Sequence, residues 1–218
     1  MIPDPPPEPD APRGEGPGGE PAVRVLVGLG NPGPRYAGTR HNVGFEVLDL
    51  VAARLGARPE PLQAGGRTLA DLYQDPGGAF CLVWPMTFMN RSGGPVAAVL
   101  RRLEREGARP AELFVVVDDI HLPLGALRIR PRGSAGGHNG LRSLEEVLGT
   151  GEWARLRIGV GAPRDPGETV EHVLGPFRRS ERPVLEETLE TASWAAEDWI
   201  RGAGLDELQG RYNRRSPP

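Results

Sequence analysis

The sequence predicts a single α/β domain, in which a twisted mixed, largely parallel sheet has helices on both faces. Short runs rich in Val, Leu and Ile alternate along the chain with segments of helical periodicity, as in α/β folds. The length of 218 residues is enough for one hydrophobic core that needs neither disulfides nor a metal. The chain shows no internal repeat, so one domain is expected.

The expected strands are short apolar runs, several of them hydrophobic on both faces as buried strands are. They occupy residues 23–29, 67–75, 79–84, 112–118 and 156–160. A further strand is expected over residues 128–132, where three arginines alternate with other residues and therefore emerge on one face.

The expected helices show apolar side chains at helical spacing. In residues 43–56 these side chains share one face, and Gly56 provides a stop signal. The same periodicity predicts helices over residues 94–107, 140–149 and 181–202.

The two ends of the chain differ from this domain in composition. Residues 1–22 are almost wholly Pro, Gly, Ala and acids, and such a segment cannot offset its ordering entropy, so it is expected to be a disordered tail. It lacks the pattern of a secretory signal, and its acids argue against a transit peptide. The domain should then span residues 23–213, followed by a short flexible C-terminus, 214–218. No apolar stretch is long enough to span a membrane, so a soluble, cytoplasmic protein is expected.

Cysteine and charge restrict the chemistry. Cys81 is the only cysteine, which excludes an internal disulfide, and its apolar surroundings favour a buried structural thiol over a nucleophile. The net charge is -3, and all 26 basic residues are arginine. Acids concentrate in the N-terminal tail and in residues 184–199, whereas residues 128–132 and 153–159 are basic. A basic patch on an acidic protein is therefore possible.

Glycines 28, 30 and 33 form the pattern G-x-G-x-x-G directly after the first expected strand. In a dinucleotide-binding loop the helix begins at the third glycine. Here Pro34 and Gly38 oppose a helix, which is expected to begin near Asn42, so the pattern is not that of a dinucleotide site. The loop still lies at the carboxyl end of a strand, where open α/β sheets bind ligands, and its glycines would let the backbone approach a substrate.

Four segments carry polar residues at the expected ends of strands. They contribute Asn31 and His41; Phe88, Met89 and Asn90; Asp118 and Asp119; and Ser134, His138 and Asn139. Each has a simpler interpretation when taken alone, because histidine and asparagine also cap helices and form turns, and paired aspartates cap turns or bind metals.

Together these residues indicate hydrolysis without a metal. His41 is suited to act as general base, since the ordinary pKa of histidine, about 6.5, lies near working pH. A carboxylate at Asp118 that accepts the other ring N–H would fix the tautomer. Amides at Asn31, Asn90 and Asn139 could bind carbonyls and a developing oxyanion. The chain lacks G-x-S-x-G, which favours water as nucleophile, and its histidines show no recognisable zinc spacing.

The candidate residues lie in five longer motifs that follow one another along the chain: "GLGNPGPRYAGTRHNVGF", "PMTFMNRSGGPV", "DDIHLPLG", "GSAGGHNGL" and "RLRIGVG". In order and spacing they resemble the signatures of bacterial peptidyl-tRNA hydrolase, over roughly residues 23–213. The resemblance implies a monomeric, cofactor-free esterase with no obligate protein partner. Such an enzyme cleaves the ester between a peptide and the terminal ribose of tRNA, and so recycles tRNA from stalled translation.

The resemblance also implies roles for individual residues. His41 would be the proton acceptor, Asp118 would stabilise its basic form, and Asn31 would discriminate N-blocked peptidyl-tRNA from free aminoacyl-tRNA. Contacts to the tRNA 3' end and the peptide would come from Tyr36, Phe88, Asn90 and Asn139, with Met89 lining the peptide groove. His121 departs from the family pattern, because an acid usually stands at its position.

A tRNA partner requires a basic docking face, because phosphate contacts supply most of the affinity. The resemblance makes Arg130 and Arg157 the candidates for a phosphate clamp on the acceptor stem and 5' phosphate, with Arg128 nearby. Arg155 has the same strand parity as Arg157. A solvated edge is the alternative for these arginines. For the whole chain, a non-catalytic RNA-binding relative and a small-molecule or peptide hydrolase remain alternatives.

Overall fold

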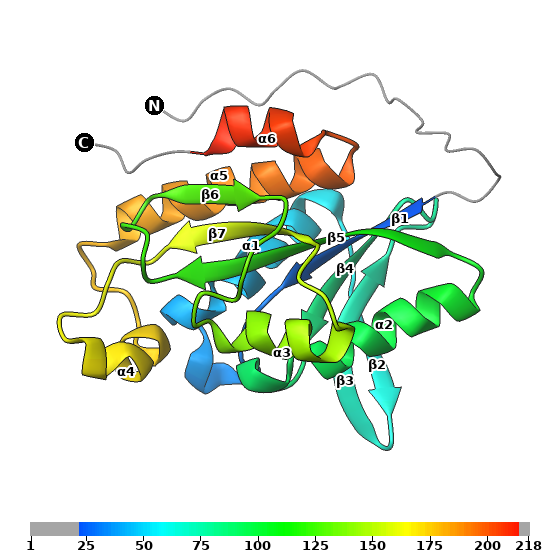
Figure 1. The fold of residues 1–218 in the computed structure, drawn as a ribbon, viewed down its shortest axis with the longest axis horizontal. Helices are drawn as coiled ribbons and strands as arrows, with labels where there is room; N and C mark the ends of the chain where they lie inside the picture. Colours follow the sequence, from blue (N-terminus) through cyan, green and yellow to red (C-terminus); the bar gives the residue numbers. More distant parts are fainter. Residues whose placement is uncertain (1–21, 214–218) are drawn as a thin grey trace.

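A computed structural model of the protein describes residues 22–213 (Figure 1). Its centre is one seven-stranded sheet with the order β2-β3-β4-β1-β5-β7-β6. The strands are β1 (Ala22–Gly28), β2 (Glu60–Ala64), β3 (Arg67–Gln74), β4 (Phe80–Pro85), β5 (Arg109–Asp119), β6 (Leu127–Arg130) and β7 (Ala154–Gly159). The four central strands are parallel, and β3, β2 and β6 add antiparallel pairs at the edges. The predicted mixed, largely parallel sheet is confirmed.

Helices cover both faces of this sheet, as predicted. They are α1 (Val43–Leu55), α2 (Gly93–Arg105), α3 (Asn139–Leu148), α4 (Thr169–Leu174), α5 (Arg182–Ile200) and α6 (Leu205–Tyr212). The core beneath α1, α5 and α6 receives Leu26 and Phe114, whereas the core beneath α2 and α3 receives their strand neighbours Val25 and Val115. Alternation along each central strand thus supplies both cores. Within residues 22–213 no helix has the length and apolar character needed to cross a membrane.

Three elements were not predicted, because their sequences lack a clear apolar period. β2 is an edge strand in which only one residue of five is even partly buried. α4 is short, and α6 buries only Leu208 and Tyr212. β1 begins one residue before its predicted start. The remaining predictions for the ends of the chain concern residues 1–21 and 214–218, which lie outside the described residues.

The glycines after β1 allow α1 to approach the sheet closely. A Cβ atom on Gly28 would lie 2.3 Å from the carbonyl oxygen of Gly44, and one on Gly44 would lie 2.5 Å from the carbonyl of Val116. A Cβ on Gly30 would lie 2.6 Å from the Phe45 ring. The expectation that these glycines let the backbone approach a substrate is therefore corrected for Gly28 and Gly30, which serve helix packing.

Gly33 has a different role, because its φ of 103° belongs to a turn and nothing lies near its Cβ position. A short 3-10 turn over Pro34–Tyr36 follows, and α1 begins only at Val43. This late helix start confirms that the glycine pattern is not a dinucleotide loop.

Cys81 lies in β4 and is fully buried. Burial raises the pKa of its thiol to about 12, with smaller opposing effects of Arg102, which lowers it, and Glu106, which raises it. The prediction of a structural thiol agrees with this environment.

We expect Gly28→Ala to lower the free energy of unfolding by about 1–3 kcal/mol, because the new methyl group overlaps the backbone of α1. Gly94→Ala is the matched control, since a Cβ at this position of α2 meets nothing within 4 Å. Urea unfolding of both variants checks this expectation. Equal stability of the two variants would contradict the close-contact interpretation.

Candidate active site

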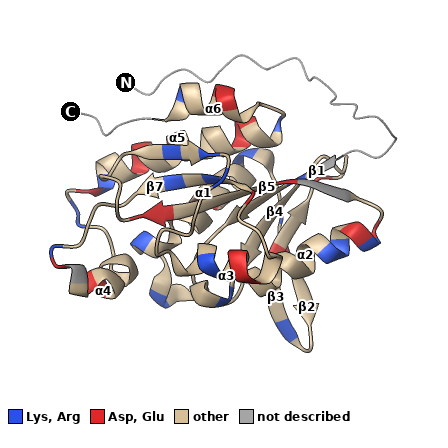
Figure 2. Cartoon of the chain, viewed as in Figure 1, with Lys and Arg blue, Asp and Glu red and all other residues tan. Residues whose placement is uncertain are grey.

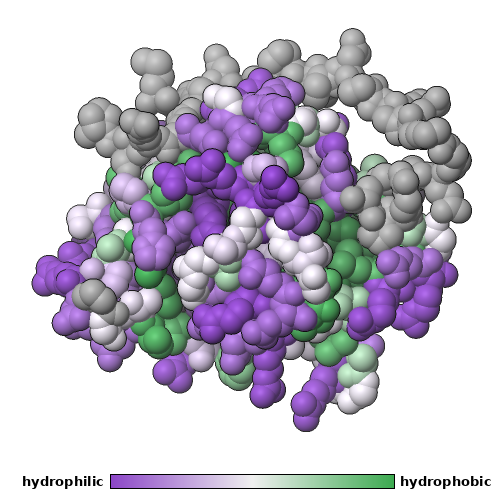
Figure 3. Space-filling model, in the orientation of Figure 1, coloured by the Kyte–Doolittle hydropathy of each residue, from purple (hydrophilic) through white to green (hydrophobic). Residues whose placement is uncertain are grey.

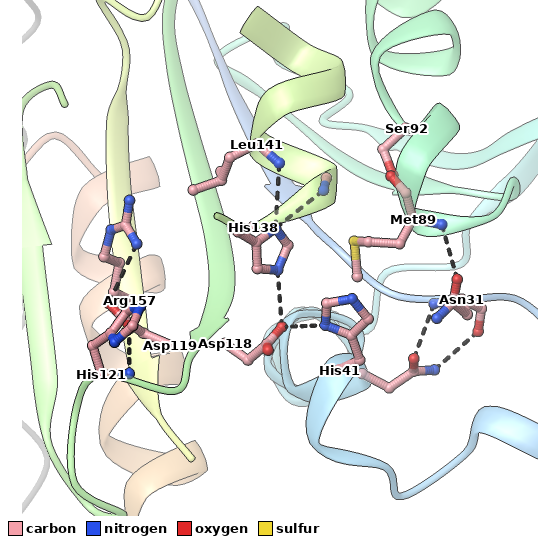
Figure 4. Close-up of polar contacts among 12 residues, drawn as sticks. Asn31, His41, Met89, Ser92, Asp118, Asp119, His121, His138, Leu141 and Arg157 are labelled. Atoms are coloured by element: carbon pink, nitrogen blue, oxygen red, sulfur yellow. Dashed lines mark hydrogen bonds and ion pairs between the residues drawn. The ribbon is translucent and has the colours of Figure 1, made fainter. Parts of the chain in front are cut away.

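Three residues predicted as part of a site, Asn31, His41 and Asp118, lie near one another at the carboxyl ends of β1 and β5 (Figure 4). β1 and β5 are adjacent parallel strands. The loop after β1, which carries Asn31, and the end of β5, which carries Asp118, therefore reach the same edge of the sheet. The loop after β4 and the start of α3 complete the group. The fold therefore brings together segments that are far apart in the sequence.

Asp118 lies at the centre of this group and is buried. One of its oxygens, Oδ1, lies 2.8 Å from Nδ1 of His41 and 3.0 Å from Nε2 of His138 (Figure 4). Burial raises the pKa of the Asp118 carboxyl, but electrostatic attraction to the two imidazoles and the hydrogen bonds that they donate outweigh burial and hold that pKa well below its usual range. The carboxylate is therefore ionised at neutral pH, and the predicted contact with His41 is confirmed.

The bonding partners assign the ring protons of both histidines. His138 caps α3, and its Nδ1 accepts the backbone N–H groups of Gly140 at 3.1 Å and Leu141 at 3.3 Å. Its proton is therefore on Nε2 and is donated to Asp118. His41 likewise donates from Nδ1 to Asp118, and within residues 22–213 no group bonds to its Nε2. His41 thus presents a lone pair at Nε2 that can accept a proton.

His138 was named in the sequence as a loop residue but not as a member of the site. A histidine between a glycine-rich loop and a helix is often only a helix cap. The fold shows in addition that His138 and His41 both contact Asp118. The two rings also approach each other, with centroids 4.9 Å apart.

Asn31 is fixed by the backbone around it. Its side-chain oxygen accepts the N–H of Met89 at 2.8 Å, so its amide nitrogen remains the available donor. Asn42 holds the main chain of Asn31 from both sides, with its Oδ1 accepting the Asn31 N–H at 2.9 Å and its Nδ2 donating to the Asn31 carbonyl at 3.0 Å. The sequence placed Asn42 at the start of a helix but did not indicate this clamp.

An aromatic pair stands beside the buried groups. Phe88 is 56% exposed, and its ring packs edge-on against Tyr36 with centroids 6.2 Å apart. Met89 is buried, and its sulfur lies against Gly140, where a Cβ would be only 2.5 Å away. The two remaining predicted substrate amides are exposed: Asn90 and Asn139.

Asp119 has a different set of partners from its neighbour Asp118. Its Oδ2 lies 3.3 Å from Nη1 of Arg157, and its Oδ1 accepts the backbone N–H of His121 at 2.8 Å (Figure 4). Arg157 also donates from Nη2 to the carbonyl of Ser134 at 2.7 Å, and its side chain is 13% exposed. Arg157 is therefore partly buried and bonded on two sides, while the His121 side chain, at the position that departs from the family pattern, lies at the surface.

A basic strand lies next to this group. Arg128 and Arg130 are exposed on β6, where Arg128 pairs with Arg157 of β7 and Arg130 pairs with Arg155. Figure 2 shows basic segments of β6 and β7 on the side of the sheet where β5 ends in acidic residues, and hydrophilic residues gather over β6 in Figure 3. Arg155 does not join them at the surface, because its side chain is fully buried.

The C-terminal helix supports this strand. β6 is the edge of the sheet, and the backbone of Ile129 would otherwise be unpaired on its outer side. Asn213 accepts the N–H of Ile129 at 2.6 Å, and Gln209 donates to its carbonyl at 3.0 Å. Side-chain amides thus replace a further strand next to the exposed arginines.

His41, Asp118 and His138 could also hold a metal ion, because the potential ligand atoms lie within 4.8 Å of one another. The protonation pattern fits a hydrogen-bond network better. For His138 to coordinate through Nε2, that atom must lose the proton that it donates to Asp118, while Nδ1 still faces two backbone N–H groups.

Comparison with known proteins identifies close relatives of the chain. A family profile described as "Peptidyl-tRNA hydrolase" matches residues 25–218. The peptidyl-tRNA hydrolase of Halalkalibacterium halodurans is 45% identical over 195 residues, which cover 88% of this chain and 100% of that protein. The protein of the same name from Thermus thermophilus is 43% identical over 189 residues, which cover 87% of this chain and 95% of that protein. A crystal structure of peptidyl-tRNA hydrolase from Acinetobacter baumannii superimposes with a TM-score of 0.77 at 27% identity, covering 92% of this chain and 100% of that one.

We expect the network around Asp118 to stabilise the fold above about pH 4 and to lose this effect in acid. The pKa of Asp118 is lower in the folded protein than in the unfolded chain, where it is about 3.9, so the stabilisation is complete above that value and falls as the pH decreases. The stability difference between wild type and Asp118→Asn should narrow by up to about 1.4 kcal/mol per pH unit below about pH 4. Urea unfolding at several pH values measures the stability of both proteins. A stability difference that does not change with pH would contradict a lowered pKa of Asp118 in the folded protein.

Proposed function

The chain belongs to the peptidyl-tRNA hydrolase family, and from this premise we propose that a water molecule activated by His41 cleaves the ester between the peptide and the 3'-terminal ribose of peptidyl-tRNA. The observation that carries the proposal is the His41 ring, whose Nδ1–H is bonded to a buried carboxylate and whose Nε2 has no bonding partner among the described residues. This is the arrangement that a general base requires.

The proton follows a closed path in this mechanism. Nε2 of His41 takes a proton from water as the water oxygen bonds to the ester carbonyl carbon. Asp118 stabilises the resulting imidazolium by charge and by its hydrogen bond. When the carbon–oxygen bond to the ribose breaks, the imidazolium returns its proton to the 3' oxygen. The products are tRNA with a free 3'-hydroxyl and a peptide with a free carboxyl group.

Asn31 supplies a neutral donor beside this base. Because its oxygen is bonded to the Met89 N–H, its Nδ2 can donate to a substrate carbonyl. An N-blocked peptide offers such a carbonyl, whereas the free ammonium of aminoacyl-tRNA is itself a donor and does not match. We assign to Asn31 the discrimination between these substrates. Asn90 and Asn139 are the further amide contacts, and Met89 lines the peptide groove.

Phe88 and Tyr36 are suited to the single-stranded 3' end of tRNA. Unpaired bases stack on exposed aromatic rings without a requirement for sequence. Phe88 is 56% exposed, and Tyr36 packs against its ring at an interplanar angle of 81°.

Arg128 and Arg130 form the docking face for the acceptor stem in this proposal. They are exposed and carry no acidic partner within the described residues. Arg157 completes a clamp for the 5' phosphate, for which it must exchange part of its bonding to Asp119. The enzyme would act as a monomer in the cytoplasm and return tRNA from stalled translation, without a cofactor.

We expect His41→Ala to lower kcat by about 10²–10⁴-fold, the usual contribution of a general base, and to leave folding and tRNA binding largely intact. His121→Ala is the matched control, because that imidazole is exposed and lies outside the proposed machinery. Hydrolysis of N-acetyl-aminoacyl-tRNA measures both variants. Near-normal turnover of His41→Ala would overturn the mechanism.

We expect Arg130→Ala to weaken tRNA binding and to reduce the slope of log affinity against log salt by about 1, because each phosphate contact releases about one counterion. Arg101→Ala serves as control, since it removes an exposed arginine from α2 on another part of the surface. Binding of deacylated tRNA across a salt series gives both slopes. An unchanged slope for Arg130→Ala would remove that residue from the docking face.

A further inference from the structure

The loop that delivers His138 has few side chains with which to hold itself in place. Residues 131–138 connect β6 to α3, and three of them are glycines with positive φ: Gly133 (153°), Gly136 (60°) and Gly137 (84°). Glycines lose more conformational freedom on ordering than other residues do. Since the loop must place His138 within hydrogen-bond distance of Asp118, something outside the loop has to fix its backbone.

Arg155 supplies four donor contacts to main-chain carbonyls around this loop. Its Nη1 lies 2.5 Å from the carbonyl of Gly133 and 3.3 Å from that of Ser134. Its Nη2 lies 2.8 Å from the carbonyl of Gly151 and 3.1 Å from that of Trp153. One rigid guanidinium therefore joins the beginning of the loop to the beginning of β7.

The surroundings of Arg155 are unusual for a charged group. Its side chain is fully buried, and its guanidinium stacks on the Trp153 ring at 4.0 Å. Glu145 is the one carboxylate within ion-pair distance in the described part of the chain, at 3.8 Å. Burial lowers the pKa of Arg155 to about 10, with a further lowering by Arg157, so the group is still cationic at neutral pH. Burying such a cation is costly, and its four carbonyl contacts offset the cost.

We propose that Arg155 is a positioning residue for the catalytic site: by fixing the carbonyls of Gly133 and Ser134, it holds the loop that places His138 against Asp118 and Asn139 toward the substrate. Its part in catalysis rests on the proposed function of His41 and Asp118. Arg157, two residues further along β7, assists because its Nη2 donates to the same Ser134 carbonyl.

The proposal requires the planar fork of arginine as well as its charge. Lysine keeps the charge but presents a compact ammonium that cannot reach both pairs of carbonyls at once. Arg155→Lys therefore separates the charge from the geometry. The matched control is Arg54→Met. Arg54 is a second arginine that stacks on a tryptophan, Trp194, at 4.1 Å, but its side chain is only partly buried and joins α1 to α5 away from the loop.

We expect Arg155→Lys to lower kcat by about 10–100-fold with KM changed less than about twofold, a loss like that of other groups that orient a catalytic shell. Nitrogen-15 NMR of labelled histidines should show that His138 loses its single Nε2–H tautomer, while His41 keeps its Nδ1–H. Arg54→Met should lower the melting temperature and leave kcat and the His138 signal unchanged. A wild-type His138 signal in Arg155→Lys, or a change in KM alone, would overturn the proposal.

The position of His138 can be measured separately from hydrolysis. The NMR signal of His138 reports positioning even if the protein shows no hydrolytic activity, so failure of the proposed function would be distinguishable from failure of this inference. If Arg155→Lys does not fold, hydrogen exchange of the wild-type protein decides instead. The backbone amide of His138, bonded to the carbonyl of Ala135 at 3.1 Å, should then exchange as slowly as the β7 amides. Exchange as fast as in the exposed turn after β5 would overturn the proposal.

Discussion

The buried carboxylate of Asp118 is the interaction on which the site depends. An ionised group in the interior is costly unless hydrogen-bond donors surround it. Here both donors are imidazole N–H groups that meet the same oxygen. One of these rings, His138, is fixed as a helix cap, so the carboxylate has a permanent partner and His41 is the ring that remains free to change its protonation at Nε2. A single buried charge thereby assigns different roles to two histidines.

This arrangement places strict demands on the packing around it. His41 precedes α1, and α1 reaches the sheet only because Gly28 and Gly44 let two backbones approach without side chains between them. On the other side, Arg155 and Arg157 hold the main chain that leads to His138. The pair of His41 and Asp118 is thus supported from two directions by elements that contribute no side chain to the proposed reaction.

Much of the fold could be predicted from the sequence, because apolar patterns indicate the central strands and four of the helices. The polar segments that follow those strands also indicate His41, Asp118 and Asn31 as candidate site residues. The remainder depends on contacts between distant segments. Nothing in the sequence around His138 or Asn42 distinguishes a site residue from an ordinary cap, and alternation alone assigns Arg155 to the same face as Arg157 without indicating that it is buried. β2 and α6 were missed because edge elements bury too few apolar side chains to show a period.

The central claim is that this chain cleaves peptidyl-tRNA by a base-activated water, with a buried carboxylate and no metal. The most direct measurement is the release of N-acetyl-amino acid from N-acetyl-aminoacyl-tRNA by the purified protein in the presence of EDTA, with unblocked aminoacyl-tRNA as the comparison. Rapid cleavage of the blocked substrate alone is the predicted result. A folded protein that binds tRNA but releases no N-acetyl-amino acid would contradict the account and identify a non-catalytic RNA-binding relative.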